Sequence, residues 1–260
     1  MRSNEKISIK DMYINKDTLS TRLNLHEKYS VNKYGWHKWV YDQYKFNENM
    51  NILELGCWTG TTWIGSVKKI PKNVNIILTD ISPLMIEKTK EILSIDNRFT
   101  FQIIDIQNIP FEDKKFDVVI ANHMLYHVPD MTKALSEIKR TLKNNGLFYT
   151  TTFGKNSLQE LTDIYRDYEN IVKFNYSDEC SFTLENGEEI LKKYFGNIDK
   201  NFYIDSLEVT NAKDLMDYII SYNKIPEEIY QEIYKKIETE INKNGIFKIK
   251  KDQGMFICKI

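Results

Sequence analysis

The sequence predicts a doubly wound α/β fold, in which helices cover both faces of a mainly parallel, Rossmann-like β-sheet. Between residues 51 and 152, short apolar runs alternate with segments of helical length, and this alternation is the signature of βαβ units. The 260 residues include 42% hydrophobic residues. Because single cores stop growing near about 250 to 300 residues, we expect one domain, 1–260.

Five runs are expected to form the strands of the core. Each is short, apolar and rich in β-branched or aromatic residues. In chain order they are NILEL (51–55), NIILTD (75–80), TFQIID (100–105), FDVVIA (116–121) and GLFYTTT (146–152).

Two of the helices between these runs have clear start signals. Ser82 followed by Pro83 places a capping hydroxyl and a proline at the start of LMIEKTKEIL. Asp130 is expected to cap MTKALSEIKRTL. Gly146, shortly after that helix, can take the left-handed conformation that ends helices.

The core, 47–154, is flanked by two further segments. Residues 1–46 are rich in Tyr and Trp and predict a helical, aromatic N-terminal cap. Residues 155–260 predict two helices around a polar loop near FNYSDECSF (174–182), then a strand, two more helices and C-terminal strands. The tail, 245–260, alternates in polarity and contains KDQG, so we expect a hairpin or edge strands there.

Composition narrows the function classes. The 36 Lys+Arg nearly balance the 37 Asp+Glu, and the five arginines are scattered, which disfavours a nucleic-acid substrate. Cys57, Cys180 and Cys258 lie far apart without CxxC spacing, which favours reduced thiols in a cytoplasm and argues against a metal site. The polar start and the lack of an 18-residue apolar stretch predict neither a secretory signal nor a membrane span.

Ligands of open α/β sheets lie over the carboxyl ends of the strands. Gly56 and Gly60 follow the first run and let the backbone approach a ligand, although a tight strand-to-helix turn alone would also favour glycines. Asp80 ends the second run, where an acid can accept both hydroxyls of a ribose. The alternative is that Asp80 caps the next helix, a role that Ser82 fills better.

The other strand ends point to the same ligand. Asp105 can accept from the exocyclic amine of adenine while Ile106 lies against the ring, or it is simply a solvated loop acid. Asn122 and His123 follow the fourth run, and we expect them to lie beside the loop that follows the first run, 51–55. The GxGxxG spacing of a nicotinamide site is absent, and the shorter loop with Glu54 favours an adenosine joined to an amino acid, namely S-adenosylmethionine.

These residues resemble those of class I S-adenosylmethionine-dependent methyltransferases, in particular the small-molecule group with an LELGCGTG-type motif. The resemblance runs from Ile52 to Phe153 and is most specific in FDVVIANHMLYHVPDMTKALSEIKRTLKNNGLFYTTTFG (116–154). LHEKYSVNKYGWHKWV (25–40) is similar to the aromatic cap of a bacterial branch. The family implies a seven-stranded sheet whose last strand, GMFICKI (254–260), is antiparallel, with 155–260 on the substrate side.

The resemblance also implies the roles of the cofactor-binding residues. S-adenosylmethionine would be the cofactor, and a methyl group would pass to a small-molecule acceptor. The implied contacts are Glu54, Gly56, Cys57 and Gly60 to the methionine part, Asp80 to the ribose, Ile81, Asp105 and Ile106 around the adenine, and Asn122 to the amino group.

Trp58 departs from the pattern, since the family has glycine at this position. The residue fits if its φ is negative and its indole points to the substrate side or the cap, whereas a positive φ would cost on the order of 1 to 2 kcal/mol. A non-catalytic adenosylmethionine-binding or scaffold protein therefore remains an alternative. An NAD(P)-dependent oxidoreductase ranks lower, and an RNA or protein methyltransferase lower still.

Methyl transfer needs alignment and, for a hydroxyl acceptor, a base. His123 is the first base candidate and His127 the second, although His127 fits a packed, structural histidine better. His37 is expected to be exposed. The residues expected to line an acceptor pocket, with packing as the alternative, are Tyr29, Trp36, Trp58 and Tyr126.

Overall fold

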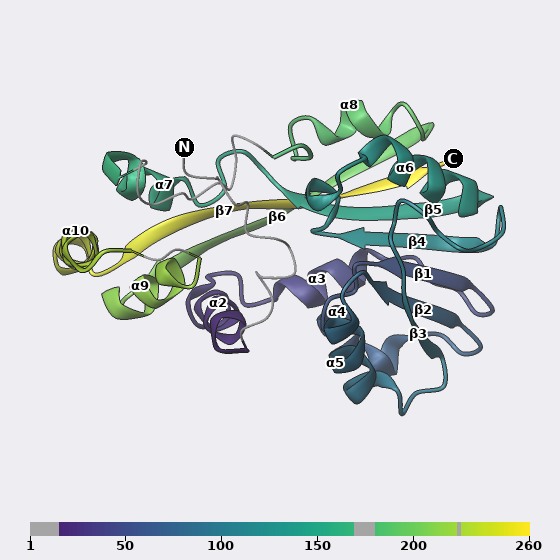
Figure 1. Cartoon of the computed structure of the whole chain (residues 1–260), viewed down its shortest axis with the longest axis horizontal. Helices are drawn as coiled ribbons and strands as arrows, with labels where there is room; N and C mark the ends of the chain where they lie inside the picture. Colours follow the sequence, from purple (N-terminus) through teal and green to yellow (C-terminus); the bar gives the residue numbers. More distant parts are fainter. Residues whose placement is uncertain (1–15, 169–179, 223–224) are drawn as a thin grey trace, which may run out of the picture. The chain divides into compact units, whose positions relative to one another are not determined.

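The computed structural model describes residues 16–168, 180–222 and 225–260 (Figure 1). These residues form two compact units. Unit 1 is made of described residues within 1–33, 155–179 and 204–252, and unit 2 of 34–154, 180–203 and 253–260.

The two units cut across the predicted segments. Of the expected cap, helix α2 (Lys16–Tyr29) belongs to unit 1, whereas α3 (Trp36–Gln43) belongs to unit 2. Strands β6 (Asn197–Val209) and β7 (Phe247–Lys259) each contain residues of both units. That the whole chain acts as one domain stays a prediction.

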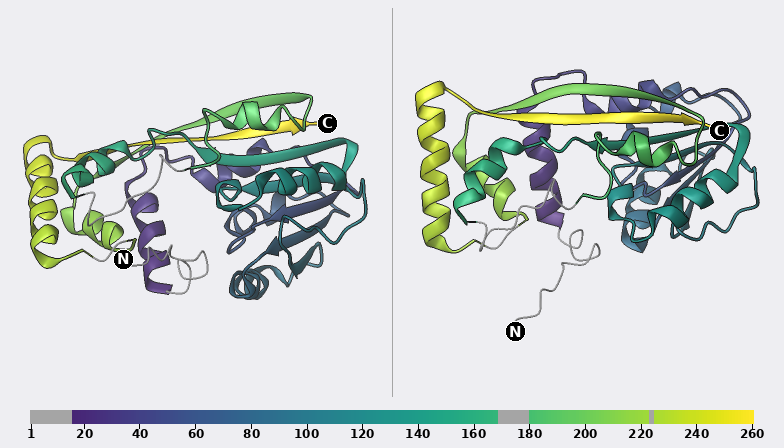
Figure 2. Two further views of the ribbon diagram at one scale, coloured as in Figure 1. Left: turned by 45° about the horizontal axis from the view of Figure 1, so that its top comes forward. Right: turned by 90° about the horizontal axis from the view of Figure 1, so that it is seen from above.

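Seven strands form one mixed sheet in the order β3-β2-β1-β4-β5-β7-β6 (Figure 2). β1 to β5 pair in parallel, and β7 is antiparallel to β5. The predicted fold class, including its antiparallel last strand, is therefore confirmed. The remaining strands are β1 (Asn51–Leu55), β2 (Asn75–Asp80), β3 (Phe99–Ile103), β4 (Phe116–Asn122) and β5 (Leu142–Phe153).

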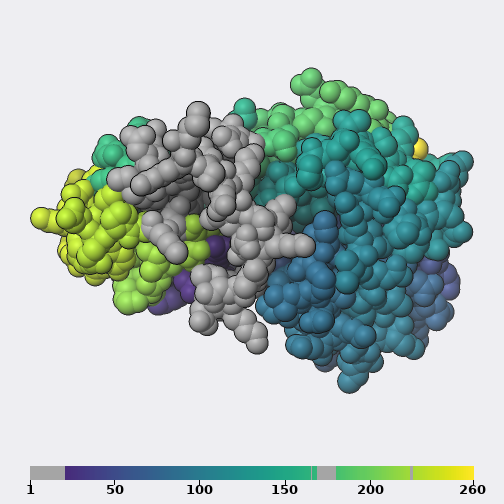
Figure 3. Space-filling model, viewed as in Figure 1, coloured from purple at the N-terminus to yellow at the C-terminus, as the bar shows by residue number. Residues whose placement is uncertain are grey.

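Helices of unit 2 cover both faces of its part of the sheet, as Figure 1 shows. In β4, Val118 and Ile120 pack in the core under α3, α4 (Thr61–Ile64) and α5 (Pro83–Leu93). Val119 and Ala121 point the other way, into the core under α6 (Met131–Thr141) and α8 (Gly187–Leu191). Because both faces are buried, the parallel strands are continuous apolar runs. The outer sides of α5 and α6 form part of the surface seen in Figure 3.

Unit 1 has an apolar core of its own. It is built from residues of α2, α9 (Ala212–Ile220), α10 (Glu227–Asn244) and the nearby stretches of β6 and β7. Leu158 and Leu161 add to this core at the start of α7 (Gln159–Tyr165). Over the described residues, none of the helices combines the length and the apolar character that crossing a membrane requires.

The helix-start signals are only partly confirmed. Asp130 caps α6 by accepting from the backbone N–H of Lys133 at 2.9 Å, and Pro83 opens α5. The expected cap by the Ser82 hydroxyl is wrong, because its side chain makes no capping bond. The Asp80 carboxylate instead accepts from the Ser82 N–H, at 2.9 Å.

Two turn predictions are wrong. β5 begins at Leu142, directly after α6, and Gly146 lies inside this strand without a positive φ. The KDQG stretch is no hairpin turn, because β7 is one continuous strand with Gly254 opposite Thr152 of β5. Its alternating polarity is that of a long strand. Of the expected polar loop at 174–182, residues 174–179 lie outside the described residues.

Candidate functional site

The turn after β1 contains three residues with positive φ. Gly56 has φ 71°, Trp58 51° and Gly60 69°. Of the two conformations considered for Trp58, the structure has the costly one with positive φ. For a bulky side chain this conformation costs on the order of 1 to 2 kcal/mol, so the surroundings must hold it in place.

Neighbouring elements hold the backbone of Trp58. Its N–H donates to the carboxylate of Asp80 at 3.0 Å, at the end of β2. Its carbonyl accepts from the hydroxyl of Thr89 in α5 at 2.6 Å. The preceding N–H, of Cys57, donates to the Thr79 carbonyl at 2.8 Å. The strained turn is thus tied to β2 on one side and to α5 on the other.

The two glycines are explained by conformation and packing. A Cβ on Gly60 would lie 2.8 Å from Thr89 Cγ2 and 2.9 Å from Leu93 Cδ1, closer than real contacts allow. A Cβ on Gly56 would lie 3.2 Å from Met124 Cγ. The alternative in which these glycines close a tight turn is therefore supported. Cys57 also faces the core, where burial raises the pKa of its thiol.

Asp80 is the polar centre of the β2 end. Its carboxylate is partly buried and accepts from the N–H groups of Trp58 and Ser82. Burial raises the pKa of Asp80, and the backbone N–H groups oppose this rise. A carboxylate has about four acceptor positions, so Asp80 can still accept hydroxyl donors from a ligand.

Glu54 lies at the centre of a buried polar network in β1. One of its oxygens accepts from the indole N–H of Trp63 at 2.5 Å, and the other from the amide of Asn122 at 3.4 Å. The same amide donates to the Tyr44 hydroxyl at 2.7 Å. Burial raises the pKa of Glu54 to about 7, against the effect of the Trp63 and Asn122 bonds.

Two of these residues, Trp63 and Tyr44, were not predicted as site residues. Trp63 is fully buried, and a Trp inside a strand-to-helix turn motif is a sequence signal for such a partner. Tyr44 lies just beyond α3, 78 positions before Asn122, and nothing in the sequence pattern connects the two.

Buried polar atoms near these strand ends that make no hydrogen bond to the described residues include the amide oxygen Oδ1 of Asn122 and the indole nitrogen Nε1 of Trp58. The first is an acceptor and the second a donor. Buried polar groups are rarely left unsatisfied in native proteins, so a ligand or a bound water would complete each of these two atoms.

The adenine side of the expected site is less polar. Ile81 follows Asp80 and is 54% exposed, an apolar surface that a flat base can cover. Asp105 lies in the turn after β3 and accepts from the N–H of Gln107 at 2.8 Å, which agrees with the loop-acid alternative. Ile106 is only 6% exposed and packs in the core shared with β1.

His123 follows β4 with φ 47°, a second strained residue. Its N–H donates to the Thr151 carbonyl at 3.0 Å. Its ring lies 5.1 Å from that of Trp36, and its Nδ1 3.5 Å from the hydroxyl of Tyr126. Three predicted residues, His123, Trp36 and Tyr126, are thus brought together. Sequence reasoning missed Tyr203, a buried aromatic residue of β6 whose ring is 5.3 Å from Trp36.

The other predicted aromatic and histidine residues are placed differently. The ring of His127 contacts Tyr126, with centroids 4.5 Å apart, and burial lowers the pKa of His127, which supports a packed histidine. Tyr29 belongs to unit 1, where its buried hydroxyl donates to Asp214 at 2.6 Å. The expected exposure of His37 is wrong, since it is half-buried and its Nδ1 lies 3.3 Å from the Thr62 hydroxyl.

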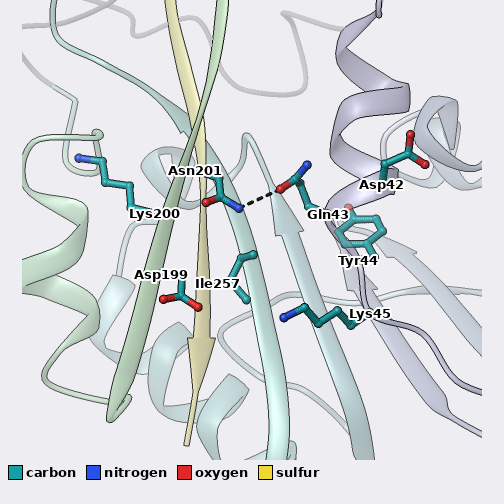
Figure 4. A pocket seen from close by; sticks show the side chains of 8 residues that line it. All are labelled: Asp42, Gln43, Tyr44, Lys45, Asp199, Lys200, Asn201 and Ile257. Atoms are coloured by element: carbon teal, nitrogen blue, oxygen red, sulfur yellow. Dashed lines mark hydrogen bonds between the residues drawn. The ribbon is translucent and has the colours of Figure 1, made fainter.

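Unit 2 also has a polar groove of about 360 Å³, which shares Tyr44 with the network around Asn122 (Figure 4). Across it the amide of Asn201 donates to Gln43 at 2.8 Å. None of the predicted site residues lines it. The lining residues are Asp42, Gln43, Tyr44, Lys45, Asp199, Lys200, Asn201 and Ile257. Among the residues that the structure describes, no three His, Cys, Asp or Glu side chains are grouped to hold a metal ion.

Known proteins share this core. Residues 46–198 match the model of a family described as a methyltransferase domain. Malonyl-[acyl-carrier protein] O-methyltransferase 1 of Ilyobacter polytropus is 30% identical over 160 residues, 61% of this chain and 58% of that protein. The ubiquinone/menaquinone biosynthesis C-methyltransferase UbiE of Citrifermentans bemidjiense is 28% identical over 137 residues, 51% of this chain and 58% of that protein. The chain thus spans somewhat more than half the length of these curated relatives.

A solved structure extends the likeness of fold. The YcgJ protein of Bacillus subtilis superposes with a TM-score of 0.60 at 14% identity, over 86% of this chain and 97% of that one. At this identity the likeness shows the fold alone, whereas the family match covers more than half of the chain. The chain belongs to the methyltransferase-domain family, with the fold of class I S-adenosylmethionine-dependent methyltransferases.

Proposed function

We propose that this protein transfers a methyl group from S-adenosylmethionine to a small-molecule acceptor. The proposal rests on the family and on the polar groups at the carboxyl ends of β1, β2 and β4. The observation that carries it is the buried Oδ1 of Asn122, an acceptor without a partner among the described residues. An ammonium group, such as that of the cofactor's amino acid, satisfies such an oxygen.

The remaining contacts follow from the same geometry. Asp80, held by two backbone N–H groups, would accept the ribose hydroxyls. Ile81 would cover one face of the adenine, and Asp105 and Ile106 would lie at its edge. Glu54 would act indirectly, since its carboxyl group orients Asn122 from inside the protein. Gly56, Cys57 and Gly60 would supply the shape of the turn around the methionine part.

The bound cofactor supplies an electrophilic methyl group on its sulfonium. The protein then has to align the acceptor and exclude water, with few further requirements. Trp36 and Tyr126 would form the apolar walls beside His123. For an alcohol or phenol acceptor, His123 would take the hydroxyl proton, because imidazole titrates near neutral pH. His127, whose pKa is lowered by burial, would support this loop.

The names of the relatives favour an organic acceptor group, which in one of them is carried on a protein. One is named for O-methylation of malonyl-[acyl-carrier protein] and the other for C-methylation in ubiquinone/menaquinone biosynthesis, so related domains serve different methylated atoms. The thiols of Cys57, Cys180 and Cys258 are free, which suits the reducing cytoplasm as the place of action.

Calorimetry tests the proposal directly. We expect the protein to bind S-adenosylmethionine and S-adenosylhomocysteine, and not NADH. Binding of NADH alone would favour the oxidoreductase alternative. If both adenosyl ligands bind but no label passes from methyl-labelled cofactor to any small molecule of a cell extract, the non-catalytic alternative is favoured.

A further inference from the structure

We propose that the indole N–H of Trp58 is a cofactor-binding group that donates a hydrogen bond to the carboxylate of the amino-acid part of S-adenosylmethionine. This inference rests on the proposed function and goes beyond it. It gives a role to the one residue of the β1 turn at which the chain departs from the glycine of the family.

The first argument is the state of the indole nitrogen. Nε1 of Trp58 is buried and has no hydrogen-bond partner among the described residues. An indole can only donate, so nothing but an acceptor satisfies it. The neighbouring Trp63 differs in this respect, because its indole N–H donates to the Glu54 carboxyl group.

The second argument is the charge of the predicted cofactor site. Besides the Cys57 thiol, its ionisable side chains are the acids Glu54, Asp80 and Asp105, and no Lys or Arg is among the predicted contacts. A cofactor carboxylate entering this site must therefore be bound by neutral N–H donors. Trp58 supplies a buried one.

The third argument is complementarity. Asn122 at the end of β4 has an unused acceptor, while Trp58 after β1 has an unused donor. β1 and β4 are neighbours in the sheet, paired in parallel at Glu54 and Ile120. A zwitterionic amino acid carries one ammonium and one carboxylate group. The two unsatisfied atoms match these groups one to one.

The fourth argument is that the residue is fixed before the ligand binds. The Trp58 backbone has φ 51° and is held by Asp80 through its N–H and by Thr89 through its carbonyl. A donor on a fixed backbone loses less freedom on binding than one on a free loop. The strain at this position therefore has a use in binding.

The test compares two ligands and two proteins. S-adenosylhomocysteine carries the carboxylate, whereas 5′-methylthioadenosine lacks the whole amino-acid part. Trp58→Phe removes the N–H and keeps an aromatic ring. We expect this variant to bind S-adenosylhomocysteine roughly tenfold to a hundredfold more weakly than the wild type, the effect of one hydrogen bond to a charged group. Its affinity for 5′-methylthioadenosine should not change.

Trp39→Phe is the matched control, since it removes a half-buried indole N–H of α3 outside the predicted contacts. It should leave both affinities unchanged. An equal loss for both ligands in Trp58→Phe, or no loss for either, overturns the inference. If the wild type binds neither ligand, the proposed function fails as well, so the two failures are distinguishable.

Nuclear magnetic resonance of the wild type gives a readout that does not depend on a folded variant. The indole N–H signal of Trp58 is first assigned by correlating it with the backbone signals of the same residue. It should move downfield on addition of S-adenosylhomocysteine and remain in place with 5′-methylthioadenosine. A Trp58 signal that responds alike to both ligands contradicts a bond to the carboxylate.

Discussion

Two strand ends of unit 2 are each followed by a residue with positive φ. They differ in whether a hydrogen-bond donor or an acceptor is left unsatisfied there. After β1, Trp58 has φ 51°, and after β4, His123 has φ 47°. The Asp80 carboxylate accepts from the N–H of the first residue, and both the carbonyl and the hydroxyl of Thr151 accept from the N–H of the second. The β1 end leaves a buried donor unsatisfied, and the β4 end, at Asn122, leaves a buried acceptor.

The two strand ends have different roles in the proposed site. At the β1 end a side chain from another strand fixes the turn, so a substitution there acts on cofactor binding. At the β4 end the carbonyl and the hydroxyl of Thr151 hold the backbone of His123, whose side chain is the proposed base. Strained residues cluster where the surrounding structure determines them fully, as at active sites.

Asp80→Ala should abolish most of the cofactor affinity that depends on the end of β1. It removes the acceptor of the Trp58 N–H and the expected acceptor of both ribose hydroxyls. Two hydrogen bonds to a charged group correspond to roughly a thousandfold in affinity for S-adenosylhomocysteine. Calorimetry measures this loss, and a thermal melt checks that the variant is folded. Wild-type affinity in this variant would refute the ribose assignment.

His123→Asn should remove the proposed base at the end of β4. Asn tolerates a positive φ, so the backbone after β4 is retained while the base is lost. With a hydroxyl acceptor, turnover should fall roughly 100-fold or more, whereas the affinity for S-adenosylhomocysteine should stay within about twofold. His127→Gln is the comparison. If that variant loses turnover and His123→Asn does not, the base has been assigned to the wrong histidine.

Glu54→Gln should change the pH dependence of stability, because the pKa of the buried Glu54 carboxyl group is raised. The pKa of Glu54 is about 7 in the folded protein and 4.5 in its ordinary state, so the unfolded chain ionises first as pH rises. The free energy of unfolding of the wild type should therefore fall between about pH 4.5 and 7, and the variant lacks this fall. Relative to the wild type, the variant should gain about 2 to 3 kcal/mol from pH 4.5 to pH 8.

Urea denaturation at several pH values measures this gain. Parallel stability curves for the two proteins would show that the pKa of Glu54 is not raised. A variant that instead loses stability relative to the wild type as pH rises towards 4.5 would show that the pKa of Glu54 is lowered, the opposite of the prediction.

Tyr44→Phe should produce the smallest effect. It removes the hydroxyl that accepts from the Asn122 amide and leaves the ring in the core. A less firmly oriented Asn122 should weaken S-adenosylhomocysteine binding about fivefold, with turnover at saturation unchanged. Tyr149→Phe is the matched control, because its hydroxyl accepts from the Lys45 N–H and does not contact Asn122. Equal effects of both variants would make the role of Tyr44 merely structural.

The sequence predicted the fold well where strands are buried on both faces. β1 and β2 have the predicted bounds, because their apolar runs end at sharp changes in polarity. The long strands β5 and β7 were predicted too short or broken. Their polar stretches, KNNG and KDQG, have the composition of turns. KDQG is part of a continuous strand, with Gln253 and Gly254 paired to β5, whereas KNNG is an irregularity between Leu142, opposite Phe116, and Leu147, opposite Val118.

The sequence predicted which strand ends form the site, but not which side chains bond to one another there. The acids and the amide follow from position along each strand. The Glu54–Trp63 and Asn122–Tyr44 bonds do not, because each joins side chains that only the folded chain brings together. The positive φ of Trp58 was not predicted either, since its stabilisation comes from Asp80 and Thr89, 22 and 31 positions away.

The most direct test of the central claim is a crystal structure of the protein with S-adenosylhomocysteine. The account predicts the ribose hydroxyls on Asp80, the ammonium group on Asn122 Oδ1 and the carboxylate on Trp58 Nε1, each within about 3.2 Å. A ligand bound elsewhere, for example in the polar groove beside Asn201, or an indole of Trp58 that occupies the space expected for the cofactor, would contradict it.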